Sequence, residues 1–138
     1  MKNYTISEVA AMCEMSRETL RYYESIGLID APERSAGGFR QYSEETIERL
    51  HFIKRAQDNG FTLKEIAELL LLSSQPQSSS SSVRNMVQKK LNEVDAKIEQ
   101  SKKLRASLQM LLKKCNGTAS VADCPIIEDM SADIKMNP

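Results

Sequence analysis

Apolar side chains recur at helical spacing along the chain, and polar breaks divide the pattern into segments of different length. Near the start, Thr5 and Glu8 stand three residues apart in front of an apolar run, which is typical of a capping box at a helix N-terminus. After a short turn, Ser16 is placed to cap a second helix that ends at Gly27. Two short helices joined by a tight turn predict a helix-turn-helix unit.

The segment after Gly27 changes character and contains a proline, a Gly-Gly pair and residues typical of strands. Residues 28–29 and 39–42 are expected to pair as a hairpin on either side of this turn. Such a hairpin next to a helix-turn-helix unit is a candidate wing. Two more helices follow, the first capped by Ser43 and the second opened by another capping box, Thr62 with Glu65.

A serine-rich break over 73–82 separates these elements from a long helical pattern over 83–114, which contains neither glycine nor proline. At about 1.5 Å per residue the helix is about 48 Å long. Its apolar stripe consists of Val87, Leu91, Val94, Ile98, Leu104, Leu108 and Leu111. A small domain cannot cover so long a stripe, so the pattern predicts a coiled coil with a second copy of the chain.

Composition narrows the function classes. The 138 residues carry 19 basic and 19 acidic side chains, so any nucleic-acid contact depends on a local basic face. No apolar run is long enough to cross a membrane, and the N-terminus lacks a signal-peptide pattern. We therefore expect a cytoplasmic protein without membrane contact. No nucleophile–base pair or catalytic carboxylate pair is recognisable, so we expect no enzymatic activity.

The three cysteines raise a separate question, because disulfides are improbable in a cytoplasmic chain. Cys115 and Cys124 bracket a loop of glycine and small polar residues just after the long helix, and Pro125 then opens a short helix over 125–131. Structural thiols, a metal site and a reversible disulfide all remain open for this pair. Cys13 lies on the apolar side of the first helix and is expected in the core.

The segments "YTISEVA", "TLRYYESIGLI", "RSAGGFRQYS" and "RLHFIKRAQDNGFTLKEI" resemble the MerR family of bacterial transcription regulators over residues 3–70. The resemblance implies a mainly α protein with four parts. These are a winged helix-turn-helix DNA-binding domain over 1–72, a linker over 73–82, an antiparallel dimerisation coiled-coil helix over 83–114, and a metal-binding loop, short helix and tail over 115–138.

The resemblance also implies a homodimer that binds double-stranded promoter DNA and acts on RNA polymerase only indirectly, through the promoter. Planar arginine donors suit phosphates and guanine edges, and a Gly-Gly turn lets the backbone approach DNA closely. The family usually has an aromatic residue, often tyrosine, where this chain has Phe39. The candidate DNA-binding residues are Ser16, Thr19, Arg21, Tyr22, Tyr23, Arg34, Gly38, Phe39, Arg40 and Tyr42.

Within this family, two cysteines around such a loop mark metal sensors, and "CNGTASVADCPIIE" resembles the loop of the copper-efflux regulators. Thiolates select soft ions, and two of them satisfy Cu(I) or Ag(I) in linear geometry, whereas Zn(II) normally takes four ligands. The family's divalent sensors take a further cysteine from the partner's helix, where this chain aligns Ser80. We therefore expect Cys115 and Cys124 to bind Cu(I) or Ag(I), with Zn(II) or another soft divalent ion as the alternative.

Three other possibilities are weighed against this prediction. A drug sensor requires a larger C-terminal domain than residues 115–138 can form, and an aldehyde or thiol-stress sensor requires only one reactive cysteine. A purely structural coiled-coil protein has no use for the Arg21 and Arg40 pattern. His51, Met110 and Met130 are expected to serve packing or surface roles rather than to bind metal.

Overall fold

The computed structural model describes residues 2–136, with side chains described as far as Ser131. The chain divides into two compact units, with the boundary between Met86 and Val87, and each unit is described by itself. Among the residues whose side chains are described, those of the buried core all lie in the first unit. The second unit consists of most of one long helix and the loop and helix that follow it.

The first unit begins with helices α1 (Ile6–Cys13) and α2 (Arg17–Ser25). Thr5 and Glu8 form the predicted capping box, in which each side chain accepts a hydrogen bond from the other residue's backbone N–H. The turn between the helices contains Glu14 in the left-handed conformation, with φ at +53°. The predicted helix-turn-helix unit is therefore present.

A short antiparallel hairpin follows, made of β1 (Glu33–Arg34) and β2 (Arg40–Gln41). The hairpin is present, but the prediction that Leu28 and Ile29 form its first strand is wrong. Both of these side chains are buried in the core, because the chain after Gly27 turns inward before it reaches the strand. The turn is closed between Ser35 and Phe39, where N–H to O is 2.7 Å.

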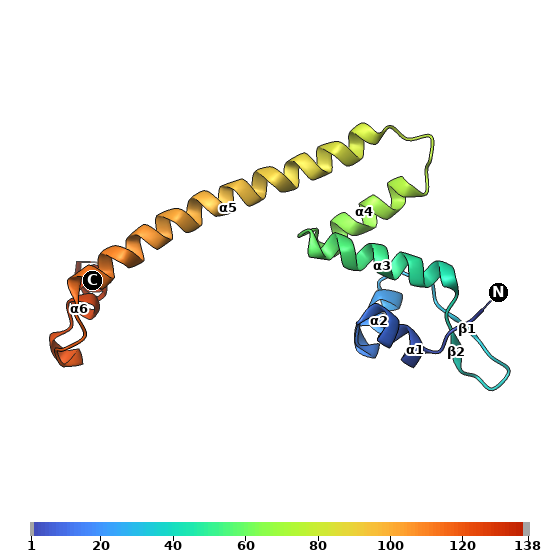
Figure 1. Cartoon of the computed structure of the whole chain (residues 1–138), viewed down its shortest axis with the longest axis horizontal. Coiled ribbons are helices and arrows are strands. Elements are labelled where there is room, and N and C mark those ends of the chain that lie inside the picture. Colours follow the sequence, from blue (N-terminus) through green and yellow to red (C-terminus); the bar gives the residue numbers. More distant parts are fainter. Residues whose placement is uncertain (1, 137–138) are drawn as a thin grey trace. The chain divides into compact units, whose positions relative to one another are not determined.

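Helices α3 (Glu44–Asp58) and α4 (Leu63–Ser73) complete the first unit. Figure 1 shows α3 between α4 on one side and the pair α1 and α2 on the other, with the hairpin near the start of α3. The apolar faces of these elements meet in one core that includes Val9, Leu20, Leu50, Ile53 and Ile66, each at most 1% exposed. This core fixes the second helix and the hairpin on one scaffold.

Helix α5 (Ser80–Lys114) begins three residues earlier than the predicted helix, so three of the serines assigned to the linker are helical. No residue of α5 is buried in the single chain. The stripe predicted for the coiled coil is largely exposed, with Val87, Leu91, Val94 and Ile98 between 42% and 50% accessible.

Beyond α5, a single 3-10 turn (Val121–Asp123) leads into helix α6 (Pro125–Met136). Pro125 opens this helix as predicted, but the prediction that it stops at Ser131 is wrong, because the helix continues to Met136. The segment contains alanine, lysine and methionine and no helix breaker, which explains its extension. Residues 137 and 138 of the predicted tail lie outside the described part of the chain.

Candidate functional site

The N-terminal end of α2 presents a group of polar and aromatic side chains to solvent. Ser16 caps the helix by accepting a hydrogen bond from the Thr19 N–H at 3.0 Å, and the two hydroxyls share a second bond of 2.8 Å. Arg21 and Tyr22 are exposed further along the helix, with Tyr22 53% accessible. These positions suit contacts to DNA bases and phosphates from a helix in the major groove.

Tyr23 differs from its neighbour Tyr22. It is only 4% exposed, and its hydroxyl donates to Gln57 Oε1 of α3 at 3.2 Å. Tyr23 therefore has a structural role in the single chain, because the ring packs in the core beside Leu20, three residues earlier on the same helix face. Its DNA contact stays a prediction.

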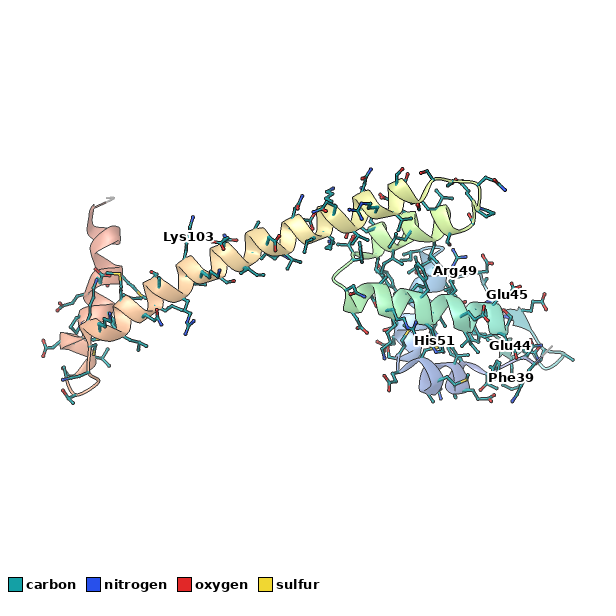
Figure 2. The ribbon with its side chains drawn as sticks, turned by 45° about the horizontal axis from the view of Figure 1, so that its top comes forward. Phe39, Glu44, Glu45, Arg49, His51 and Lys103 are labelled. Atoms are coloured by element: carbon teal, nitrogen blue, oxygen red, sulfur yellow. The ribbon has the colours of Figure 1, made fainter. Side chains whose placement is uncertain are left out.

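The hairpin carries the other predicted DNA contacts. Phe39 is 75% exposed at its turn, and Figure 2 shows this residue at the hairpin. Gly38 has φ at +82°, a conformation that L side chains rarely adopt, which explains a glycine at this position. The Arg34 guanidinium donates to the Gly38 carbonyl at 2.9 Å and thereby braces the turn. Arg34, Gly38 and Phe39 thus form an exposed tip.

Arg40 and Tyr42 point instead toward the end of α2. Arg40 Nη1 lies 2.5 and 2.6 Å from the two carboxylate oxygens of Glu24, and the Tyr42 hydroxyl donates to Oε2 of the same carboxylate at 2.8 Å. Burial raises the pKa of Tyr42, so its hydroxyl remains a protonated donor at neutral pH. Tyr42 is 1% exposed, so it has a structural role in the single chain, and its DNA contact stays a prediction.

Glu24 was not among the residues singled out from the sequence, although it stands inside the quoted "RYYE" segment. Its side chain is 10% exposed, and it receives hydrogen bonds from two residues that lie 16 and 18 positions further along the chain. The signal available in the sequence was an acidic residue at the end of a helix whose other motif residues are basic or aromatic.

The second unit brings Cys115 and Cys124 together. Their sulfur atoms are 4.0 Å apart, and both residues are half-buried. Between them the chain turns at Asn116, whose side-chain oxygen accepts hydrogen bonds from the Thr118 N–H at 3.1 Å and hydroxyl at 2.7 Å. The Gly117 N–H points toward the sulfur of Cys115 at 3.4 Å. The loop therefore holds both thiols on the same side.

Cys124 occupies a favourable position for a thiolate, immediately before the first residue of α6. Backbone N–H groups of Ile127 and, to a smaller extent, Ile126 lower the pKa of Cys124, with a further contribution from Cys115. Burial of the sulfur and the negative charge of Glu128 oppose this effect. Helix N-termini stabilise negative charge because their N–H groups are not used inside the helix.

The thiol pair fits a soft metal ion. On the scale of a zinc–sulfur bond of about 2.3 Å, two thiolates on one ion lie about 3.8 Å apart in tetrahedral and about 4.6 Å apart in linear geometry. The observed 4.0 Å lies between these values, so small rotations of the side chains reach either. In the described part of the chain, no group of three or more His, Cys, Asp or Glu side chains is arranged to hold a metal.

The other side chains that could bind a soft metal are Cys13, His51, Met110 and Met130. Cys13 is 2% exposed in the core of the first unit, as predicted, and burial raises its pKa although Lys54 opposes the shift. His51 is exposed on α3, where Figure 2 shows it. Met110 and Met130 are 63% and 55% exposed.

A helix-turn-helix unit with an adjoining hairpin defines a DNA-binding class of protein, and the comparisons with known proteins agree. The profile of the MerR helix-turn-helix regulatory proteins matches residues 4–72, and that of the MerR DNA-binding region matches residues 47–111. The chain is 39% identical over 127 residues to the mercuric resistance operon regulatory protein of Bacillus cereus, covering 92% of this chain and 96% of that protein. The chain belongs to the MerR family, which confirms the family prediction.

Solved structures of related regulators have the same fold. One is the regulator PbrR691 of Ralstonia metallidurans CH34 in complex with lead(II), with a TM-score of 0.83, 31% identity, and coverage of 92% of this chain and 98% of that one. Another is MerR of Bacillus megaterium MB1 in complex with mercury(II), with a TM-score of 0.71, 35% identity, and coverage of 93% and 99%.

The relatives are transcription regulators, which confirms the prediction that this chain is not an enzyme. Within residues 2–136, the structure contains no helix that is long and apolar enough to span a membrane.

Proposed function

We propose that this chain is a metal-responsive transcription activator that binds promoter DNA as a homodimer in the bacterial cytoplasm. The proposed DNA contacts are residues at or near the surface around α2 and in the hairpin. The exposed ones are Ser16, Arg21, Tyr22, Arg34, Gly38 and Phe39, and the partly buried ones are Thr19 and Arg40. The thiols of Cys115 and Cys124 are the proposed metal ligands. The single observation that carries the metal response is the 4.0 Å distance between their sulfur atoms.

The ligand set favours a monovalent soft ion. Two thiolates complete the coordination of Cu(I) or Ag(I), whereas Zn(II) normally requires four ligands. Since the described residues of a single chain form no group of three or more cysteine, histidine or carboxylate side chains that could hold a metal, Cu(I) or Ag(I) is the effector that the site suits best.

A divalent effector is the second candidate, because the related structures named above contain lead(II) and mercury(II). Such an ion requires at least one more ligand, which would come from the partner subunit. The residue proposed to face the loop there is Ser80, the first residue of α5. Its hydroxyl is a poor ligand at neutral pH, so this candidate ranks below the monovalent ion.

The exposed stripe of α5 supports the homodimer. Burying an apolar surface of this kind against a second copy removes it from water, and its three- and four-residue steps suit the packing of one helix against another. Charged residues such as Lys103 remain exposed on the same helix (Figure 2). An antiparallel pair of α5 helices would set the distance between the two DNA-binding units and hence between the half-sites.

Metal held between the two thiols would fix the end of α5 to the start of α6. We propose that the metal-loaded dimer then keeps its promoter bent and untwisted, so that RNA polymerase responds to the altered DNA without a direct contact. Bending a site costs on the order of 1–6 kcal/mol, a range that a bidentate thiolate site can supply. On this account the signal is the shape of the DNA rather than its occupancy.

A metal titration of the reduced protein under anaerobic conditions tests the proposal. We expect one Cu(I) or Ag(I) per subunit to resist a strong chelator, and Zn(II) to be lost to the same chelator. Cys115→Ser and Cys124→Ser should each abolish retention, and Cys13→Ser is the matched control that should retain the metal. Assayed by transcription from the bound promoter, Cys115→Ser and Cys124→Ser should lose activation but keep DNA binding, whereas Cys13→Ser should keep both.

The outcomes separate the parts of the proposal. Retention of Zn(II) with loss of Cu(I) replaces the monovalent effector by the divalent one. Equal activation by the double variant lacking both loop thiols, without added metal, rejects the metal response altogether. A response that survives Cys124→Ser but not Cys115→Ser favours a sensor with a single reactive thiol.

A further inference from the structure

Glu24 links two elements that the proposed function uses separately. It lies in the last turn of α2, and its carboxylate accepts hydrogen bonds from Arg40 in β2 and from Tyr42 just after that strand. All of these distances are between 2.5 and 2.8 Å. The carboxylate therefore ties the end of the candidate recognition helix to the base of the hairpin.

The hairpin requires such an anchor. Each of its strands has only two residues, and an isolated two-stranded hairpin is marginally stable in water. Its base is held by the bridge between Tyr4 and Tyr42, whose backbone N–H to O distances are 2.9 and 2.8 Å. These bonds join the base of the hairpin to the segment before α1, and neither of them involves α2.

The register of the hairpin places two arginines opposite each other, so the ion pair with Glu24 also offsets a repulsion between them. Arg34 and Arg40 are directly opposite each other, and like charges in opposed positions destabilise a strand pair. The two oxygens of Glu24 hold Arg40 Nη1, which neutralises one of these charges. Glu24 thereby allows two arginines to stand side by side on an element that approaches DNA.

We propose that Glu24 is a positioning residue for promoter binding, which holds Arg40 and the hairpin in a fixed relation to α2 while Arg34 and Phe39 remain exposed for DNA. This inference rests on the proposed promoter binding. Arg40 bonds to Glu24 through Nη1, and 27% of its side chain is still exposed, so the guanidinium can also donate to a phosphate. Glu24 itself is not expected to touch DNA.

Neutralising Glu24 should change DNA affinity in opposite directions, depending on whether its role is purely electrostatic or is to position the hairpin. A carboxylate close to DNA repels phosphates, so its neutralisation should strengthen binding if charge were all that mattered. If Glu24 positions the hairpin, its neutralisation should weaken binding, because the hairpin is released and two arginines are left opposed. The sign of the change therefore distinguishes the two roles.

The experiment uses the full-length chain and the DNA duplex that the wild-type protein enriches from a randomised library. Binding of Glu24→Gln is measured by fluorescence anisotropy over a range of salt concentrations. Glu33→Gln is the matched control, since Glu33 is an exposed carboxylate of the same hairpin. We expect Glu24→Gln to weaken binding about tenfold or more, with a shallower salt dependence because phosphate contacts are lost. The Glu33→Gln variant should bind as tightly as the wild type or more tightly.

Footprinting supplies a readout that a general loss of structure would not give. In Glu24→Gln, protection should disappear at the phosphates that the hairpin covers and persist where α2 lies in the groove. Tyr42→Phe keeps the buried ring and removes one hydrogen bond to Glu24, so it should show a smaller loss of the same pattern. This variant tests the inference if Glu24→Gln fails to fold by circular dichroism.

Binding of a folded Glu24→Gln protein that equals or exceeds that of the wild type overturns the inference, as does uniform loss of protection over the whole site. If Glu24→Gln does not fold, the inference is overturned when Tyr42→Phe protects the same phosphates as the wild-type protein to the same extent. Failure of the wild-type protein to enrich any duplex would instead reject promoter binding itself, so the two failures are distinguishable.

Discussion

Lys114, the last residue of α5, forms an ion pair with Asp129 of α6, with 3.1 Å between Nζ and Oδ2. The pair spans the loop that carries Cys115 and Cys124. Both side chains are about half exposed, and ion pairs in such positions contribute about 0–1 kcal/mol. The pair therefore assists closure of the loop without controlling it.

Asp129→Asn is expected to lower the affinity for the effector metal by no more than about fivefold, which corresponds to the upper limit of about 1 kcal/mol. Chelator competition measures this change, with Asp123→Asn as the matched variant in the loop. A loss as large as that caused by Cys124→Ser would show that the Asp129 carboxylate binds the ion directly.

The thiols of Cys124 and Cys13 should become reactive toward an alkylating reagent over different pH ranges. N–H groups at the start of α6, first that of Ile127, lower the pKa of Cys124 below its ordinary value of 9.0, and burial raises the pKa of Cys13 above 9.0. Only the thiolate is alkylated. In metal-free protein, the alkylation rate of Cys124 should rise with pH and level off below 9.0, whereas that of Cys13 should continue to rise above 9.0.

Mass spectrometry of the peptides after brief treatment with iodoacetamide measures both rates, and urea-unfolded protein provides the reference in which the two thiols become similar. Faster labelling of Cys13 than of Cys124 in the folded protein would contradict the prediction.

The turn between α1 and α2 offers a stabilising substitution. Glu14 has φ at +53°, and the left-handed conformation costs a non-glycine residue about 1–2 kcal/mol. Its ion pair with Lys54 is 2.6 Å long, but its side chain is 80% exposed, so the pair is screened by water. Glu14→Gly should raise the thermal midpoint of unfolding by a few degrees, and Glu14→Asn should raise it less. A lower midpoint for Glu14→Gly would mean that the pair with Lys54 outweighs the backbone strain.

The stripe of α5 can be tested at its centre. Ile98 is 47% exposed in the single chain, and full burial of such a side chain contributes about 1.5–3 kcal/mol. Because a homodimer would bury the exposed half of this side chain in two copies, Ile98→Lys should raise the dissociation constant of the dimer by about tenfold to a hundredfold. Sedimentation equilibrium measures the constant. Gln100→Lys lies about 200° away around the helix and should leave the dimer intact. Equal weakening by both variants would place the interface elsewhere.

The sequence predicted the parts of the fold that depend on neighbouring residues. The capping boxes at Thr5–Glu8 and Thr62–Glu65 are confirmed, because each is completed within four residues of chain. The start of α6 at Pro125 is confirmed for the same reason. The features that were predicted wrongly depend on contacts between residues far apart in the sequence. Leu28 and Ile29 have strand-like character, but the core of the first unit buries them before a strand can form.

The roles of the tyrosines also depended on packing. Tyr22 and Tyr23 are adjacent, and only the position of α2 against α3 directs one ring outward and the other to Gln57. The three-residue spacing of Leu20 and Tyr23 puts them on one helix face, and this spacing could have predicted that Tyr23 is buried. Glu24 was missed because its partners lie well beyond the helix, in the hairpin. The identity of the metal depends on the number of ligands, and the sequence pattern of one chain does not reveal whether a second subunit would add to that number.

Since no residue of α5 is buried in the single chain, the proposed pairing of two copies would supply most of the stability of the long helix. A dissociated copy would expose that helix to cellular proteases, while an assembled one would be protected. The abundance of the regulator would then depend steeply on its rate of synthesis, because newly made chains survive only if they find one another before they are degraded. Cells would hold either a working stock of assembled regulator or almost none.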